Sequence, residues 1–204
     1  MKRLPYLAMI MAIAITAPAL AEEFEKAGSQ LQLGETATVP HLVPKGPEVP
    51  IELKVTAIEE GSADDLKGFE VPAELANARP FYVRYEYTNA SGEDLSAQQV
   101  GAFVAIDDRD QVHSPALAMS GGSFNKCTTK PAASLTPGKT HEGCVMFMIH
   151  ENGRIVAAAY KGHYRDEAGV DTQKAFPIYY NPIRWAAAKA PGDGPTARKG
   201  VIIQ

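Results

Sequence analysis

The chain has 204 residues, of which 20 are Lys or Arg and 24 are Asp or Glu, so its formal net charge is −4. A slightly acidic chain lacks the basic patch with which nucleic-acid-binding proteins displace phosphate counterions, and this argues against nucleic acid as a partner. The same charge argues against adsorption to anionic membrane surfaces. The length suits one domain of ordinary size with short tails.

The first residues have the three parts of a secretory signal peptide. Lys2 and Arg3 are basic, residues 7–17 form an apolar run, and small residues precede a cleavage point after Ala21. The run is shorter than the roughly 20 residues that span a bilayer, so we expect cleavage and no stable membrane insertion. A lipoprotein needs a cysteine where Glu22 stands. We therefore expect a Sec-exported protein, periplasmic or extracellular.

After the leader, the chain divides into three predicted parts. Residues 22–50 should hold an N-terminal strand at Leu31–Val39 and then an extended connector, residues 51–190 a β-sandwich domain, and residues 191–204 a disordered tail. The connector is predicted from its prolines, which favour extended backbone. They are Pro40, Pro44, Pro47 and Pro50.

Short segments in which apolar and polar residues alternate dominate the sequence of the predicted domain. The clearest are residues 51–57 and 81–88, where every second side chain is apolar, as in strands with one buried face. Residues 144–149 are apolar at every position and predict a central strand buried on both faces. Asn152-Gly153 then predicts a tight hairpin to the next strand. Further strands are expected at residues 100–106, 112–113, 155–160 and 176–180.

Helical periodicity is scarce along the whole chain. One helical turn is expected at residues 63–67 and a short helix at residues 186–190. About seven short strands, separated by frequent turns, predict an all-β antiparallel sandwich, with a barrel as the alternative.

A series of short motifs follows one another between residues 53 and 185. They are Leu53-Lys54-Val55-Thr56, Gly61-Ser62, Asp65-Leu66-Lys67-Gly68-Phe69, Pro80-Phe81-Tyr82-Val83, Thr88-Asn89, Cys127, Pro137-Gly138, Cys144 and Pro182-Ile183-Arg184-Trp185. With these motifs the chain resembles a group of secreted proteins and lipoproteins, best known from actinobacteria. The resemblance implies an immunoglobulin-like β-sandwich of about seven strands with flexible termini, and no assigned activity or catalytic residue. The group's lipobox and Ser/Thr-rich tether are absent here, so membrane anchoring is not implied.

Cys127 and Cys144 are the two cysteines of the chain. An even number of cysteines in an exported protein predicts a disulfide, and the resemblance implies the same pair. Two buried free thiols are the alternative. Because the Pro137 turn separates the two positions, the bond should tie a loop to the strand that follows it, unlike the inter-sheet bond of antibody domains.

Met146, Met148 and His150 form the most interesting spacing, because alternate residues of a strand share one face. Thioether and imidazole groups are ligands that copper(I) accepts, so this face is a candidate copper site. The alternative is that the methionines fill the core, since Val145 and Ile149 make the other face apolar as well.

Other polar clusters lack a recognisable chemistry. Asp107, Asp108 and Asp110 miss the glycine of a calcium-binding loop and are interpreted as a solvated loop, as are Asp64 and Asp65. The five histidines stand in no catalytic motif; they are His41, His113, His141, His150 and His163. Some aromatic residues could line an interaction surface, although most should fill the sandwich. They are Tyr82, Tyr160, Tyr164, Tyr179, Tyr180 and Trp185.

The sequence therefore favours an exported, non-enzymatic binding or interaction module of unknown ligand. The expected partner is another protein or a cell-envelope component, and no catalytic, cofactor-binding or metal-binding residue is assigned. The alternative is a periplasmic copper carrier that uses Met146, Met148 and His150. The sequence predicts no oligomeric state.

Overall fold

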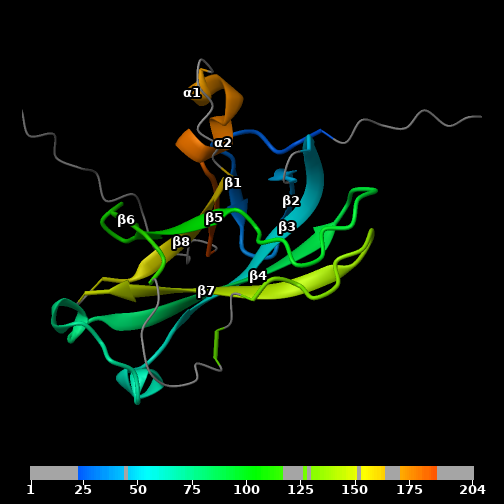
Figure 1. Cartoon of the computed structure of the whole chain (residues 1–204). Coiled ribbons are helices and arrows are strands. Elements are labelled where there is room, and N and C mark those ends of the chain that lie inside the picture. Colours follow the sequence, from blue (N-terminus) through cyan, green and yellow to red (C-terminus); the bar gives the residue numbers. More distant parts are fainter. Residues whose placement is uncertain are drawn as a thin grey trace, which may run out of the picture.

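In the computed structural model, two β-sheets pack face to face (Figure 1). The structure describes residues 23–43, 46–116, 126–127, 130–150, 153–163 and 171–187. One sheet has four strands, in the spatial order β2 (Thr36–Leu42), β3 (Glu48–Glu60), β4 (Arg79–Asn89) and β7 (Thr140–Ile149). The other has five, in the order β1 (Gln30–Gln32), β9 (Ile183–Ala186), β8 (Ile155–Gly162), β5 (Ala102–Asp107) and β6 (Val112–His113).

These sheets confirm the predicted β-sandwich. Neighbouring strands are antiparallel, except for β1 and β9, which run parallel. Helical turns are short: η1 (Ala63–Leu66), η2 (Ala73–Leu75), α1 (Thr172–Ala175) and α2 (Pro177–Tyr180). The first of these is the helical turn expected at residues 63–67.

The core lies between the sheets and follows the alternation of the sequence. Leu53 and Val55 of β3, Val83 of β4 and Phe147 of β7 are inaccessible to solvent. Burying one such side chain contributes about 1.5–3 kcal/mol, so this interior is the main source of stability. Trp185 is also fully buried, and its indole N–H donates to the carbonyl oxygen of Glu35 at 2.8 Å.

The hairpin predicted at Asn152-Gly153 is wrong. Strand β7 pairs with β4 in one sheet, whereas β8 pairs with β5 and β9 in the other, so the chain crosses between sheets here. Strand β7 is also an edge strand, although it is buried on both faces as expected. Its inner face meets the core, and its outer-face residue Met148 packs against Leu66 and Ala78 from the segment before β4.

The N-terminal part differs from its prediction in two ways. The single strand expected at Leu31–Val39 is two strands in different sheets, separated by a turn in which Gly34 has φ of 90°. Pro40 and Pro50, expected in a connector, face each other in β2 and β3. Strand β4 ends at Asn89, opposite Ile51, so no β4 residue faces Pro50, and its missing N–H costs no sheet hydrogen bond. Pro44 lies outside the described residues.

Two predictions near the C-terminus also need correction. Residues 176–180, expected to be a strand, contain the helical turn α2 with Pro177 at its first turn. Proline supplies the fixed φ that a helix start requires and removes an N–H that would have no helical partner. Ala186, expected to start a helix, is the last residue of β9, and residues 188–190 lie outside the described part.

Cys127 and Cys144 form the predicted disulfide. The bond lies on the outer face of the four-stranded sheet, where Tyr82 and Met146 pack against it. It ties the segment before β7 to β7 itself, as expected, and it does not join the two sheets. Closing a loop of 17 residues stabilises the fold by about 3 kcal/mol in the chain-entropy description.

Candidate functional site

The proposed copper ligands do not meet at an open face. Met148 is buried, with 8% of its surface exposed, and Met146 is partly buried beside the disulfide. His150 is exposed and follows the last residue of β7. Within the described residues, no three His, Cys, Asp or Glu side chains form a group that could hold a metal ion. The arrangement gives the copper hypothesis no support.

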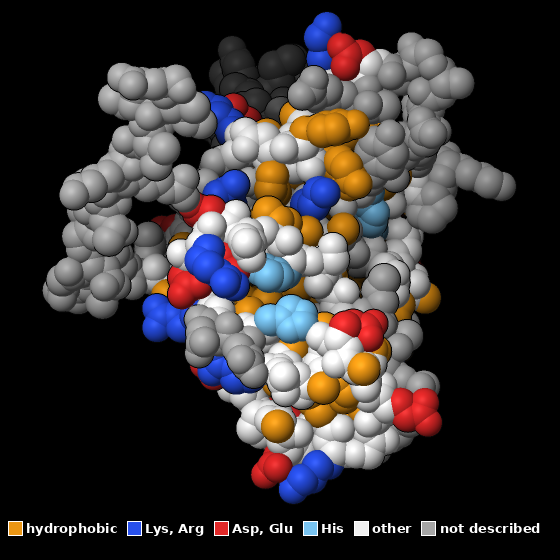
Figure 2. All heavy atoms as spheres, turned by 90° about the vertical axis from the view of Figure 1, so that its left-hand side faces the viewer, with side chains coloured by type: hydrophobic (Ala, Val, Ile, Leu, Met, Phe, Trp, Pro, Cys, Tyr) orange, Lys and Arg blue, Asp and Glu red, His pale blue; other side chains and the backbone are white. Residues whose placement is uncertain are grey.

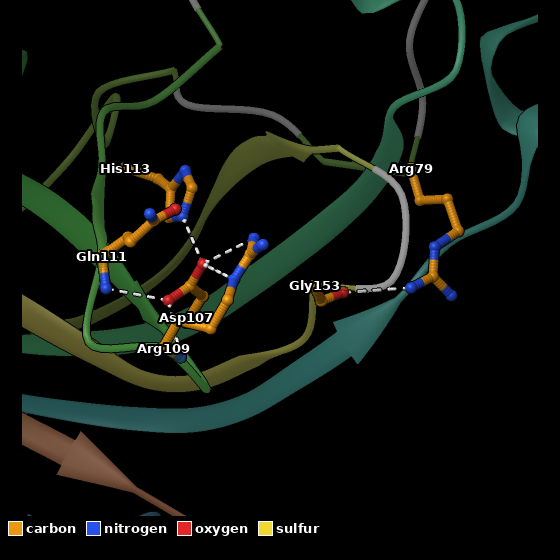
Figure 3. Close-up of polar contacts among 6 residues, drawn as sticks. All are labelled: Arg79, Asp107, Arg109, Gln111, His113 and Gly153. Carbon is orange, nitrogen blue, oxygen red and sulfur yellow. Dashed lines mark hydrogen bonds and ion pairs between the residues drawn. The ribbon is translucent and has the colours of Figure 1, made fainter.

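Asp107 is a polar centre at the end of β5 (Figure 3). Its carboxylate is fully buried, and Oδ1 accepts hydrogen bonds from the backbone N–H groups of Arg109 at 2.9 Å and Gln111 at 2.8 Å. Its Oδ2 contacts His113 Nε2 at 3.1 Å and the Arg109 guanidinium at 3.2 Å. We name this arrangement the Asp107 turn.

Every oxygen of Asp107 is therefore used inside its own loop. Burial alone would raise the pKa of the carboxyl group, but the hydrogen bonds from Gln111, His113 and Arg109 outweigh burial and hold the pKa at about 2. The solvated loop expected here is wrong for Asp107, whereas Asp108 and Asp110 are exposed. The saturation of its oxygens indicates a structural role.

Asp65 is a second buried carboxylate where a solvated one was expected. Its side chain is 6% exposed and accepts hydrogen bonds from the Lys126 ammonium group, the Ser62 backbone and the Tyr82 hydroxyl. The bond from Lys126, followed by that from Ser62, holds the pKa of Asp65 at about 2. This carboxylate links the loop before β4 to the segment that carries Cys127.

A pocket of about 420 Å³ lies at the end of the sandwich that carries α1 and α2. Figure 1 shows both helices at the same end of the molecule as the N-terminal segment. In Figure 2, hydrophobic side chains gather at this end, and Lys or Arg side chains lie near them. We name it the His163 pocket. Its lining comes from five segments: Phe24–Ala27, Pro40 of β2, Glu48 of β3, residues 161–163 after and within β8, and residues 174–179 of the helices.

Apolar and aromatic groups form most of the wall. Phe24 and Pro40 stand opposite the helical side, which contributes Phe176, Pro177 and Ile178. Apolar walls with a few polar groups are typical of small-molecule sites, whose volumes usually lie at about 300–1,000 Å³. The pocket therefore has the size and character of a ligand site.

A buried histidine pair lies against this pocket. His163 Nε2 lies 3.2 Å from His41 Nδ1, and the rings meet edge to face. The other nitrogen of His41, Nε2, lies 3.1 Å from Gln98 Oε1. His41 is 2% exposed, whereas His163 is half-buried and lines the pocket.

Gln98 sets the tautomers of both rings. Its Oε1 can only accept, so His41 carries its proton on Nε2 and offers the lone pair of Nδ1. The Nε2–H group of His163 then donates to this lone pair. The second nitrogen of a neutral His163, Nδ1, carries no proton. This chain of hydrogen bonds requires a neutral His41, whose Nδ1 must accept.

Burial keeps the pair neutral. It lowers the pKa of His163 to about 4, with a further contribution from the neighbouring His41. Burial also lowers the pKa of His41, against the opposing effect of the hydrogen bond to Gln98. If both rings took up an additional proton, two like charges would lie within 3.2 Å of each other. At neutral pH the pair is a polar but uncharged part of the pocket.

The sequence analysis missed this site, because His41 and His163 are 122 positions apart. A signal was present in β2: Ala37, Val39 and His41 occupy the inward positions of one alternation, and all three are buried. A histidine at a core position of a strand needs a polar partner, and this could have been predicted.

Most of the described aromatic residues named in the sequence analysis are buried, as expected. Tyr82, Tyr160 and Trp185 are buried, Tyr179 is half-buried in the His163 pocket, and Tyr180 is 47% exposed. Tyr164 lies outside the described residues. No helix among the described segments is long and apolar enough to cross a membrane.

The sequence matches no model of a known protein family and no curated protein. Solved structures with a similar fold include the secreted protein MPT63 from Mycobacterium tuberculosis, with 12% identity, a TM-score of 0.46 and coverage of 77% of this chain and 95% of that one. Another is an uncharacterised β-sandwich protein from Clostridium difficile 630, with 11% identity, a TM-score of 0.42 and coverage of 82% and 99%. These neighbours are secreted or uncharacterised bacterial proteins, and their likeness concerns the fold alone.

Proposed function

We propose that this protein is an exported, non-enzymatic binding module and that the His163 pocket is its ligand site. The observation that carries the proposal is an apolar hollow of about 420 Å³ beside convergent polar groups, the neutral His163 and the ammonium groups of Lys26, Lys161 and Lys174. This combination is the common form of small-molecule sites.

The site is built on rigid elements. Pro40 belongs to β2 and Lys161 belongs to β8, so strands of both sheets contribute to the pocket lining. The described lining contains no Ser, Thr or Cys that His163 could activate as a nucleophile. This supports ligand binding over acyl transfer.

The proposal of export rests on the signal-like N-terminus and is supported by the disulfide between Cys127 and Cys144. Disulfides persist in oxidising compartments and are rare where thiol-reducing systems operate. Detection of the chain from residue 22 onward in a periplasmic or culture fraction, by N-terminal sequencing, tests this part. A chain that retains residues 1–21 and stays in the cytoplasmic fraction would contradict it.

Ligand binding is tested with the protein purified after export. A panel of small apolar and amphiphilic compounds is screened by ligand-observed NMR, first on the unmodified chain and then on Ala175→Trp, which places an indole into the pocket from α1. We expect the bound compounds to lose their signal with this variant. Ala133→Trp is the matched control, because Ala133 is exposed and lies outside the pocket lining.

Two results would redirect the proposal. If compounds bind equally to both tryptophan variants, the ligand site is elsewhere. If the protein binds no compound but takes up copper(I), and Met148→Leu abolishes this uptake, the copper carrier with Met146, Met148 and His150 is the better description.

A further inference from the structure

We infer that the His163 pocket takes a small amphiphilic carboxylate, with its apolar body in the pocket and its single anionic head at the lysines. The inference rests on the proposed function and adds the chemical class of the ligand. Three observations support it: the sign of charge at the rim, the partners of the charged groups, and the neutrality of the interior.

The described lining of the pocket has one lysine more than it has carboxylates, and Asp171, which pairs with Lys174, lies outside this lining. The three lysines are Lys26, Lys161 and Lys174, and the two carboxylates are Glu25 and Glu48. The whole chain carries a net charge of −4, so a basic excess here runs against the overall composition. A cationic rim around an apolar hollow favours an anionic ligand, because it attracts negative charge and repels positive charge.

The acidic groups at the rim already have partners. Glu25 Oε1 accepts a hydrogen bond from the Ser29 hydroxyl at 2.5 Å and another from the backbone N–H of Lys26 at 3.3 Å. Glu48 is likewise engaged in an interaction. The two hydrogen bonds to Glu25 hold its carboxylate within the protein.

The lysines can reach a ligand at little cost. Lys161 Nζ lies 4.0 Å from the centre of the Tyr179 ring, and this cation–π contact keeps its charge at the pocket wall. Lys174 pairs with Asp171 at 3.3 Å, but both side chains are more than half exposed. Solvent-exposed pairs of this kind contribute about 0–1 kcal/mol, so an incoming carboxylate can compete with Asp171.

The interior offers no compensating charge. The histidine pair is neutral, and Phe176 and Ile178 complete an apolar wall. A charged group would lose its hydration there without a partner, so the ligand's charge must stay at the rim. Lys161 and Lys174 offer compact point charges, which suit a head group with one negative charge, such as a carboxylate.

The test compares three ligands that share one apolar chain: octanoate, octan-1-ol and octylammonium, titrated by calorimetry at pH 7 into the exported protein. We expect octanoate to bind about tenfold more tightly than octan-1-ol, which corresponds to one favourable charge contact, and octylammonium to bind most weakly. The double variant Lys161→Met/Lys174→Met should abolish the advantage of octanoate and leave octan-1-ol unchanged. Methionine keeps the apolar stem of lysine, and Lys139→Met in the distant Pro137 turn is the control.

The outcomes separate the inference from the proposed function. Equal binding of the three compounds, or preference for octylammonium, overturns the carboxylate and leaves the pocket as a binding site. An octanoate preference that persists in the double variant, and also in a triple variant that adds Lys26→Met, overturns it, because the rim lysines would then not bind the head group. If no compound binds to the folded protein, the proposed function fails and the inference with it.

Discussion

The Asp107 turn and the His163 pocket are both built around buried titratable groups, but they differ in how many hydrogen-bonding atoms of these groups have a partner. In the turn, the two carboxylate oxygens accept bonds from the backbone, from Arg109 and from His113. In the pocket, a line of single bonds runs from His163 to His41 to Gln98 and leaves His163 Nδ1 at its open end.

This difference agrees with a structural role for the Asp107 turn and with the proposed ligand binding at the His163 pocket. A carboxylate whose oxygens are all used by its own loop has nothing left for a ligand, and it fixes the path of the chain. An ordered imidazole beside an apolar hollow keeps one polar atom available. Ionisation differs as well, since Asp107 is held charged and the histidines are held neutral.

The largest expected effect is on the turn. Asp107→Ala removes the acceptor of two backbone N–H groups, those of Arg109 and Gln111, in a partly buried turn. We expect the free energy of unfolding to fall by about 2–4 kcal/mol, measured by urea denaturation. Asp108→Ala, at the exposed neighbouring position, should change it by no more than about 0.5 kcal/mol. Similar losses in the two variants would show that the hydrogen bonds of Asp107 contribute little.

Acidification should lower the free energy of unfolding by a smaller amount. The pH range of this loss distinguishes the His163 pocket from the Asp107 turn. The pKa of His163 is lowered in the folded state to about 4, so the unfolded chain takes up a proton first as the pH falls. Stability should therefore decline between about pH 6.5 and pH 4, by about 1 kcal/mol once partial exposure is allowed for. His163→Leu should flatten the decline in this range, measured as unfolding midpoints against pH.

Asp107 acts in the same direction, because its pKa is also lowered by folding, but it acts at lower pH. Its folded pKa of about 2 lies below its unfolded value, so its contribution is present above about pH 4 and is lost as the pH falls towards 2. Asp107→Asn should remove this lower step and leave the decline between pH 6.5 and pH 4 intact. If both variants flatten the same range, the two regions do not titrate separately.

The smallest predicted change concerns Gln98. Gln98→Leu removes the acceptor for His41 Nε2–H and should cost about 0.5–1.5 kcal/mol. The sharper measurement is the nitrogen chemical shifts of the imidazoles. We expect both rings to carry the proton on Nε2 in the unmodified protein and a tautomer mixture at His41 in the variant. Unchanged tautomers would mean that Gln98 does not order the pair.

Local patterns in the sequence predicted the strands well. The alternation of Leu53 and Val55 and of Phe81 and Val83 places these side chains in the core, as observed. The disulfide followed from two cysteines and an expected compartment. Each of these predictions depends on residues close in sequence or on a property of the whole chain.

Arrangements that depend on distant partners were not predictable in this way. Asn152-Gly153 indicates a turn, but which sheet receives the next strand is decided by β5 and β9, which hydrogen-bond to β8. Asp107 was missed for another reason: its partners Arg109 and His113 are close in sequence, but the acidic composition of the segment suggested a solvated loop. The His163 pocket needs residues from both ends of the chain, and no local pattern brings these ends together.

The N-terminal segment has a consequence for how the protein matures. Phe24 and Lys26 form part of the pocket wall, and the backbone N–H of Glu25 donates to Thr38 of the edge strand β2 at 2.7 Å. Between the predicted peptidase site after Ala21 and this wall stand only Glu22 and Glu23. If cleavage removed a few more residues, the pocket would be open on one side. The exposed edge of β2 could then pair with another chain. The precision of leader processing would then decide both ligand capture and self-association.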